Sequence, residues 1–338
     1  MNSELNFNSR FIQEFTPDSM AGATESTIVY HYTSPEAFLS IVQGKSVRFS
    51  DLRYMNDKSE SFFFVKRLLE FCDENKEKYQ HFIDVVNELL KENDYNKIKR
   101  LEIQDIRYKD FLGLRMEKQR NFIFCTSNDS DSLNMWNYYA SNGKYTGYNI
   151  GFSVPKFLKT FDVDHDGTVD SFIIYYGNVL YKKKLQFEAI EELAKAVESF
   201  ITKKPDKQSV QRAAISVRSY IELRGPFFKD ESFRSENEFR FLFSIAEKRI
   251  PHNEDEAKKY FGQYNQRLKE GFCVKNGLVV PFMQVAIPEY SISRITMAPM
   301  TEYEIAKSSI KELLNVKGLR GTNDTEIPIF KSKIPIRF

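Results

Sequence analysis

The sequence predicts a single α+β domain that carries two helical insertions. Three observations favour this class. Residues 28–57 have the pattern of a strand, a capped helix and a second strand with almost no slack between them. Residues 239–245 carry a phenylalanine or isoleucine at every second position, the period of two that a strand shows. Residues 59–119 and 184–224 have the apolar spacing of amphipathic helices, and strands interrupted in this way, without regular β–α alternation, are typical of α+β proteins.

The composition is that of a folded globular protein, because 41% of the residues are apolar and 14% aromatic, which is enough for a real core. The formal net charge of +2 gives no reason to expect a nucleic-acid or membrane partner. The three cysteines lie far apart without metal-ligand spacing, which argues against a disulfide framework and structural zinc. No N-terminal run combines a basic start with an apolar core, as a signal peptide would, and no apolar stretch approaches the roughly 20 residues of a membrane helix. We therefore expect a cytoplasmic protein without a membrane partner.

The first elements follow from local signals. Residues 1–26 are polar and predict an N-terminal arm, so the domain itself is expected over residues 27–338. Ile28 to Tyr32 is apolar enough for a short buried strand. Ser34-Pro35-Glu36 then supplies an N-cap, a proline at the first helical position and an acid in the first turn, and Gly44 supplies the stop.

His31 is placed by this pattern where the first strand leads into the helix. A helix N-terminus carries partial positive charge and free N–H groups, so it favours a neutral imidazole and offers a place for phosphate oxygens. A lone histidine in an apolar strand is more commonly a buried, hydrogen-bonded core residue. Both interpretations stay open from the residues alone.

The middle of the chain predicts a second buried strand at residues 121–126 and, behind a polar turn, a helix that contains Trp136, the only tryptophan. A glycine-flanked strand follows at residues 148–154. In the late strand, Phe239 and its alternating partners face the core, while the opposite face carries Glu238, Arg240 and, if the chain is already extended there, Glu236. Further strands at residues 278–287 and 292–297 and a helix at residues 301–314 complete the domain.

Several of these segments resemble, in order, the blocks of the bacterial domain-of-unknown-function 2971 family. The segments are YHYTSPEAFLSIVQGKSVRFSDLRYMND, FCTSNDSDSLNMWNYYASNGKYTGYNIGFS, FFKDESFRSENEFRF, ISRITMAP and KSKIPIRF. The resemblance spans residues 28–338 apart from the helical insertions. That family is in turn similar to the ADP-ribosyltransferase superfamily, and the opening unit is most similar to its DNA-targeting toxin group.

The resemblance implies an ADP-ribosyltransferase-like split mixed β-sheet core, NAD as the substrate and an unidentified acceptor macromolecule, protein or nucleic acid. It further implies a bacterial antiviral-defence effector or a toxin, with an antitoxin or an activating partner. His31 matches the family's ribose-contacting histidine, and Glu238, or Glu236 beside it, matches the late-strand catalytic glutamate. The candidates for the middle motif are Ser127, Trp136 and Tyr139. The expected NAD-binding residues are His31, Tyr32, Thr33, Arg48, Asn56, Trp136 and Tyr139.

Two glutamates in an E-x-E pair, Glu236 and Glu238, could each serve a different step of such a reaction. Cleavage of the nicotinamide bond develops an oxocarbenium-like ribose, which one carboxylate can stabilise while the second activates the acceptor. The simpler interpretation is that Glu236, Glu238 and Arg240 form an ion-paired strand face. Arg48, Arg53 and Lys229 could bind pyrophosphate but are more often surface cations. Aromatic residues such as Trp136 and Tyr139 are more often part of the core than of a binding site. Tyr54, Asn56 and Asp57 could simply form a turn, since Asn-Asp pairs favour turns.

Two other functions compete with this one. In a metal-dependent nuclease, Asp57, Glu236 and Glu238 would converge on Mg²⁺ through oxygen ligands. In a non-enzymatic module, the aromatic surface would bind a partner protein or a small-molecule signal. No bound metal is part of the favoured hypothesis.

Overall fold

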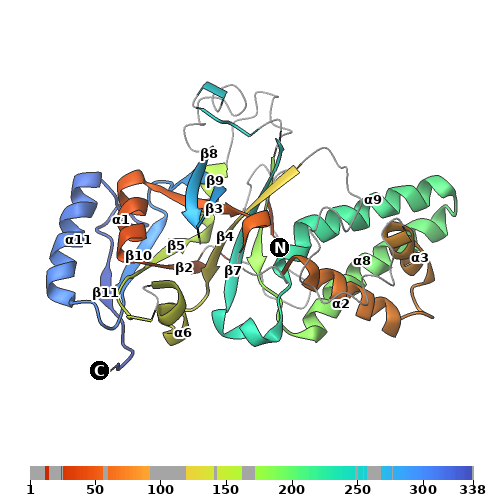
Figure 1. Cartoon of the computed structure of the whole chain (residues 1–338), viewed down its shortest axis with the longest axis horizontal. Helices are drawn as coiled ribbons and strands as arrows, with labels where there is room; N and C mark the ends of the chain where they lie inside the picture. The colour runs from red at the N-terminus through yellow and green to blue at the C-terminus, as the bar shows by residue number, and fades with distance from the viewer. Residues whose placement is uncertain are drawn as a thin grey trace.

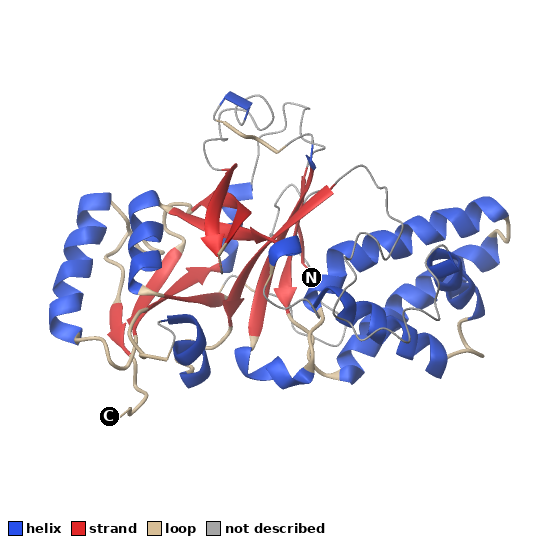
Figure 2. Cartoon of the chain, in the orientation of Figure 1, coloured by secondary structure: helices blue, strands red, loops and turns tan. Residues whose placement is uncertain are grey.

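The computed structural model describes residues 12–14, 24, 26–55, 60–91, 119–140, 143–161, 172–247, 250–253, 255–256, 268–275 and 277–336. It shows a mixed open sheet with helices, which confirms the α and β content that the sequence predicted. The strands lie in the centre of the molecule (Figure 2). Helices α2, α3, α8 and α9 gather at one end, and α1 and α11 lie at the other (Figure 1).

Eleven strands in the described part of the chain belong to this sheet. They are β1 (Ile12–Glu14), β2 (Ile28–Thr33), β3 (Ser46–Asp51), β4 (Gln119–Ser127), β5 (Tyr148–Ser153), β6 (Phe172–Asn178), β7 (Glu238–Ala246), β8 (Leu268–Lys275), β9 (Leu278–Ala286), β10 (Ile292–Met297) and β11 (Ile329–Lys331). The main order is β1-β6-β7-β4-β2-β5-β10-β11, and a side branch runs from β4 through β3 and β9 to β8.

The helices and shorter turns connect these strands. The α-helices are α1 (Pro35–Gly44), α2 (Glu60–Glu74), α3 (Gln80–Lys91), α6 (Leu133–Met135), α7 (Val154–Leu158), α8 (Lys183–Lys203), α9 (Lys207–Arg224) and α11 (Tyr303–Lys317). A π-helical turn, η2 (Trp136–Ala140), continues α6. The 3₁₀ turns are η1 (Leu52–Tyr54), η3 (Lys159–Phe161), η4 (Gly225–Phe227) and η5 (Glu231–Glu236).

The sheet divides at β4. One edge of β4 pairs with β7 along its whole length, whereas the other edge pairs with β3 at Phe122 and Ile123 and with β2 at Ser127. Beside this division, the guanidinium of Arg120 on β4 lies 2.8 Å from Asp51 Oδ2 and 2.5 Å from Glu270 Oε1. This largely buried ion network, which ties β3 and β8 to β4, could not be predicted from local sequence patterns.

The opening unit forms largely as its local signals predict. The Ser34 side chain accepts a hydrogen bond from the Ala37 amide, and Phe38 is among the buried residues of α1. The predicted stop at Gly44 is wrong by one residue. Gly44 is the last helical residue, and Lys45 takes the left-handed conformation with φ 45° while its amide bonds back to the carbonyls of the last turn.

Strand β7 is buried on both faces. Its alternating residues Phe239 to Ile245 lie in the core shared with β2, β4 and β5, as predicted. On the opposite face, Leu242 lies in a second apolar cluster built from α2, α3, α8, α9 and β6. The predicted helical insertions therefore supply a layer that covers one face of the sheet, and residues 92–118 of the first lie outside the described residues. This layer explains why the polar residues of the second face of β7 are buried as well.

The predicted N-terminal arm contributes an element of the sheet. Ile12 to Glu14 form β1, which pairs in parallel with β6 from Ile174 to Tyr176. Most of the remaining residues of the arm lie outside the described part of the chain.

Gly147 allows β5 to begin against β2. Its φ is +137°, and a Cβ there would lie 2.6 Å from the carbonyl oxygen of Thr33 and 2.9 Å from the Cβ of Ala140. We expect Gly147→Ala to lower the free energy of unfolding by about 3 kcal/mol, because backbone strain and a clash with main chain act together. Urea denaturation measures this quantity. Gly318→Ala is the control, since Gly318 also has a positive φ of +61° but no atom within 4 Å of its Cβ position. Equal losses in the two variants would contradict the prediction.

Candidate active site

Three neighbouring strands, β2, β4 and β7, bring a middle-motif candidate and the late-strand glutamate side by side. Ser127, at the end of β4, is paired on one side with Tyr30 of β2 and on the other with Glu238 of β7. Directly paired residues on antiparallel strands project to the same face of a sheet. Glu238, Ser127 and Tyr30 therefore form a row across one face of the sheet, level with the first residue of β7.

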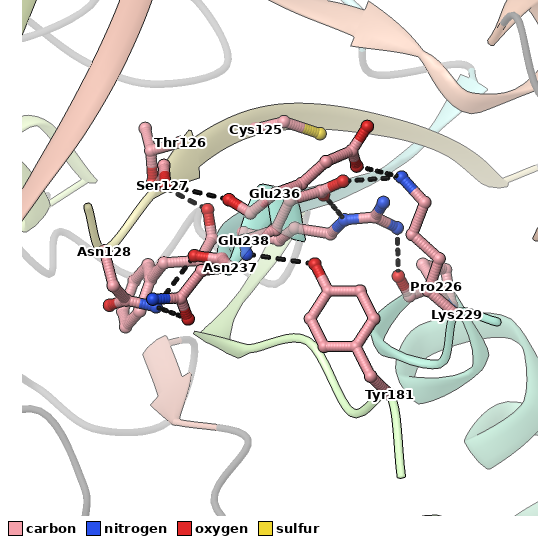
Figure 3. Close-up of polar contacts among 12 residues, drawn as sticks. Cys125, Thr126, Ser127, Asn128, Tyr181, Pro226, Lys229, Glu236, Asn237 and Glu238 are labelled. Carbon is pink, nitrogen blue, oxygen red and sulfur yellow. Dashed lines mark hydrogen bonds and ion pairs between the residues drawn. The ribbon is translucent and has the colours of Figure 1, made fainter. Parts of the chain in front are cut away.

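The centre of the site is a buried set of charges, Lys229, Glu236, Glu238 and Arg240, which we call the glutamate cluster. The ammonium of Lys229 lies 2.5 Å from Glu236 Oε2 and 2.6 Å from Glu238 Oε1 (Figure 3). The Nε of Arg240 donates to the other oxygen of Glu238, and its Nη1 donates to the carbonyl of Pro226 at 2.5 Å. All four residues are at most 9% exposed. The cluster thus contains two carboxylates and two cations removed from bulk water.

The chain between the two glutamates is a turn rather than an extended strand. Glu236 is the last residue of η5, Asn237 takes the left-handed conformation with φ 43°, and Glu238 begins β7. Asparagine tolerates this conformation better than most residues, and its amide side chain donates to Asp129 Oδ1 at 2.9 Å. By sequence alone, Glu236 lies on the same strand face as Glu238 only if the chain is already extended there. Because the chain turns at this point, the two residues do not share a strand face. The two carboxylates meet because the turn folds them onto one lysine.

Lys229 is not the surface cation that its sequence context favoured. It is 5% exposed, and its backbone is fixed on both sides. Its amide donates to the carbonyl of Leu180 at 3.1 Å, and its own carbonyl accepts from the side chain of Gln186 at 2.9 Å. The signal in the sequence was the position of this lysine directly after the apolar pair Phe227-Phe228, both fully buried.

The two carboxyl groups have opposite proton affinities. Burial, together with the hydrogen bond and charge of Glu238, raises the pKa of Glu236 to about 7 against the opposing effect of Lys229. Burial also acts to raise the pKa of Glu238, but Arg240, Glu236 and Lys229 outweigh it and hold this pKa well below its ordinary value. Near neutral pH, Glu238 is therefore ionised while Glu236 exchanges its proton.

Two tyrosines contact the cluster through their hydroxyl groups. Tyr139 from η2 donates its hydroxyl to Glu236 Oε1 at 2.8 Å and is 46% exposed, so it connects the cluster with the surface. Burial and the neighbouring Glu236 raise the pKa of Tyr139. The hydroxyl of Tyr181, which the sequence did not single out, accepts a hydrogen bond from the Glu238 amide at 3.0 Å (Figure 3).

Trp136 and Tyr32 are structural residues. For the tryptophan, this is the core position, which the sequence already favoured over a role in binding. Trp136 is fully buried, and its ring meets that of Tyr32 edge-on with centroids 4.7 Å apart. Its Nε1 donates to Asp131 Oδ1 at 2.7 Å, and the Tyr32 hydroxyl donates to the Asp129 carbonyl at 2.6 Å. Both side chains therefore hold the turn after β4, whose Asn128 amide bonds to the carbonyl of Asn237 at 2.8 Å.

His31 lies on the other face of the sheet. It is paired with Ile150 of β5 and alternates with Tyr30, so its side chain joins the face of the main apolar core, where its ring is 4.7 Å from that of Phe124. Its Nδ1 lies 3.3 Å from the carbonyl oxygen of Cys125. Burial lowers the pKa of His31 to about 4, against a smaller opposing effect of that hydrogen bond. The neutral imidazole follows from burial and links β2 to β4.

The other expected NAD-binding residues are dispersed. Thr33 is buried at the end of β2. Arg48 on β3 is exposed and stacks on the ring of Phe282, with its guanidinium carbon 4.7 Å from the ring centroid. Arg53 forms an ion pair with Asp51 at 2.7 Å. Asn56 and Asp57 lie outside the described residues.

The glutamate cluster does not have the composition of a metal centre. Lys229 and Arg240 already contact the carboxylate oxygens that a divalent cation would need. Among the residues that the structure describes, no group of three or more histidine, cysteine, aspartate or glutamate side chains could hold a metal ion.

Comparison with known proteins gives one family match. Residues 135–241 match the model of a family described as protein of unknown function (DUF2971). This segment includes η2 and the whole glutamate cluster, so the match supports the resemblance to this family of unknown function over residues 135–241. No curated protein and no solved structure matches the chain significantly. Within the described residues, no helix is long and apolar enough to cross a membrane.

Proposed function

We propose that the protein is an NAD-dependent ADP-ribosyltransferase whose reacting groups are Glu238 and Glu236. The observation that carries the proposal is the pair of buried carboxyl groups joined by Lys229, one held ionised and the other titrating near neutral pH. The resemblance of the chain to that superfamily supplies the reaction. The proposal includes a role as an antiviral-defence effector or toxin, with a partner that restrains or activates it.

Glu238 is suited to stabilise the ribose as it gains positive charge. In the reaction, the bond between ribose C1′ and the nicotinamide nitrogen breaks, and nicotinamide leaves with the bonding electrons. A carboxylate that stays ionised lowers the energy of the oxocarbenium-like ribose that remains. Arg240 orients Glu238, since its Nε donates to the carboxylate while its Nη1 donates to the carbonyl of Pro226.

Glu236 is suited to take the proton of the acceptor. A general base works best when its pKa lies near the working pH, and a carboxyl group with a pKa of about 7 meets this condition. Its hydrogen bond to the half-exposed Tyr139 places it on the side of the cluster that reaches the surface. The acceptor would approach from that side and bond to ribose C1′ as Glu236 accepts its proton.

The proposal leaves His31 out of the reacting groups. Its side chain lies on the face of the sheet opposite Glu238 and bonds to the main chain of Cys125. Tyr32 and Trp136 contribute by holding the turn after β4 in place. A nuclease centred on Glu236 and Glu238 is less well supported, because a metal ion would have to displace two buried cations.

A labelling experiment with NAD tests the proposal. The purified protein is incubated with a cell lysate and NAD labelled on the adenylate side, and nicotinamide release and label transfer are followed together. We expect Glu238→Gln to lower both by about 10²-fold or more, because it removes the charge that faces the developing cation. Thermal denaturation of the variant shows whether the fold is retained.

Glu231→Gln is the matched control, since Glu231 belongs to the same 3₁₀ turn, η5, but is exposed and paired only with Arg234 in the described residues. It should release nicotinamide as fast as the wild type. Release without transfer would identify a hydrolase of NAD. Equal activity of Glu238→Gln and wild type, or no NAD turnover with any lysate or candidate partner, would refute the proposal.

A further inference from the structure

The segment ISRITMAP places an arginine on the same face of the sheet as the glutamate cluster. Arg294 of β10 is paired with Gly151 of β5, which is paired with Tyr30 of β2. The row that begins at Glu238 and Ser127 therefore continues through Tyr30 and Gly151 to Arg294. Four strand spacings of about 4.8 Å separate its ends, or roughly 19 Å.

A β-bulge brings a second polar side chain to this end of the row. The register between β10 and β5 advances by two residues on β10, from Ile292 to Arg294, against one on β5, from Phe152 to Gly151. Ser293 is the additional residue. Bulges of this kind re-aim a side chain within a sheet, and here the Oγ of Ser293 lies 3.1 Å from the position that a Cβ of Gly151 would occupy.

Gly151 lets these side chains pack directly against the main chain of β5. A Cβ at this position would lie 2.9 Å from Cγ of Arg294, 3.1 Å from Oγ of Ser293 and 3.2 Å from Cε1 of Tyr30. Any larger residue would have to displace the arginine or the tyrosine. The absence of a side chain therefore preserves the approach of Arg294 to Ser293.

In the described part of the chain, Arg294 contacts aromatic rings and forms no ion pair with an acid. Its guanidinium carbon lies 4.9 Å from the ring centroid of Phe330 and 5.8 Å from that of Tyr30. Within the described residues, its Nε and the Oγ of Ser293 are buried and have no hydrogen-bond partner. Two buried donors without acceptors cost free energy on the order of 1–3 kcal/mol each unless a ligand or water pairs with them. A ligand oxygen that accepts from both groups would remove this cost.

We propose that Arg294 and Ser293 form a binding site for a phosphate group. A phosphate oxygen accepts from the guanidinium and the hydroxyl together, and arginine favours phosphate because its fork of donors matches the oxygens and its charge is permanent. The stacking of Arg294 on Phe330 and Tyr30 orients the guanidinium before the ligand arrives. The site requires only a ligand that bears a phosphate, so it does not depend on NAD turnover at the glutamate cluster.

Calorimetric titration of the full chain tests this site. Inorganic phosphate, pyrophosphate and AMP are titrated separately at constant ionic strength set with sodium chloride. We expect saturable binding by the wild type, a loss of affinity of about 3- to 10-fold in Ser293→Ala, and no saturable binding in Arg294→Gln. Tighter binding of AMP than of the inorganic ions would identify a nucleotide as the source of the phosphate, and equal binding would identify the free anion.

The controls separate binding from folding. Ser293→Ala removes a hydroxyl that has no partner in the described residues, so its melting temperature without ligand should not fall. This variant keeps the test decisive even if Arg294→Gln loses its ring contacts and unfolds. Arg320→Gln, which alters an exposed arginine beside Asp324, should bind as the wild type does. The proposal is overturned if the wild type shows no saturable binding or if Ser293→Ala binds phosphate as tightly as the wild type.

Discussion

Replacing Lys229 with methionine is expected to lower the free energy of unfolding by about 3–5 kcal/mol at pH 8, because the change leaves two buried carboxyl groups without their shared cation. Methionine has a similar length, so the loss reflects charge more than packing. Urea denaturation at several pH values measures the effect. Lys204→Met is the matched control, since Lys204 is exposed and its ion pair with Asp206 at 3.5 Å should contribute less than about 1 kcal/mol.

The pH dependence of this loss has a definite sign. The pKa of Glu236 is raised from its ordinary 4.5 to about 7, so the folded state holds this proton more tightly than the unfolded chain. That contribution to stability is complete below pH 4.5 and is lost as the pH rises through 7. The penalty of Lys229→Met should therefore be smaller at pH 5 than at pH 8. The double variant Lys229→Met/Glu236→Gln should recover part of it, and a pH-independent penalty would contradict the assignment of the charges.

Glu236→Gln is expected to separate the two halves of the proposed reaction. Transfer of ADP-ribose to the acceptor should fall by about 10²-fold, which is the lower range for the loss of a general base. Release of nicotinamide should fall much less, because Glu238 and its contact with Arg240 remain. The measurement is the ratio of label transferred to nicotinamide released, compared between this variant and Glu238→Gln.

The pH profile distinguishes a base from a structural residue. In the wild type, the rate of transfer should rise with pH through an apparent pKa near 7, because Glu236 must lose its proton to act. The Glu236→Gln variant should transfer slowly at every pH, without the rise in rate near pH 7 that forms the ascending limb of the wild-type profile. If Glu236→Gln keeps the limb, or if release and transfer fall together, Glu236 does not act as the base.

Much of the fold could be predicted because its signals are local. The cap of α1, the strand at residues 121–126 and the alternation from Phe239 to Ile245 each depend on neighbours in the chain, and the structure confirms all three. The end of α1 was misplaced because Lys45 adopts the left-handed conformation that the pattern assigned to glycine. The covering of β7 by the helical layer could not be predicted, since amphipathic helices do not encode which surface they bury.

The site was harder to predict because it depends on contacts between distant residues. Glu238 could be singled out by its resemblance to a family pattern, and its partner Glu236 by spacing. From the sequence, Lys229 has the appearance of a surface cation. Its burial depends on hydrogen bonds between its backbone and the distant residues Leu180 and Gln186. The face on which His31 lies depends on the register of β2 against β5, and a shift of one residue would reverse it. No pattern within the segment itself carries that information.

The position of β7 between two apolar clusters couples the packing of the sheet to that of the inserted helices. One face of the strand completes the core of the sheet, and the other completes the core of the helical layer. A chain shortened by removing residues 183–224 would expose Leu242 and would open the glutamate cluster to water. The second insertion also contacts the glutamate cluster directly, because Gln186 of α8 donates to the carbonyl of Lys229, the residue that joins Glu236 and Glu238.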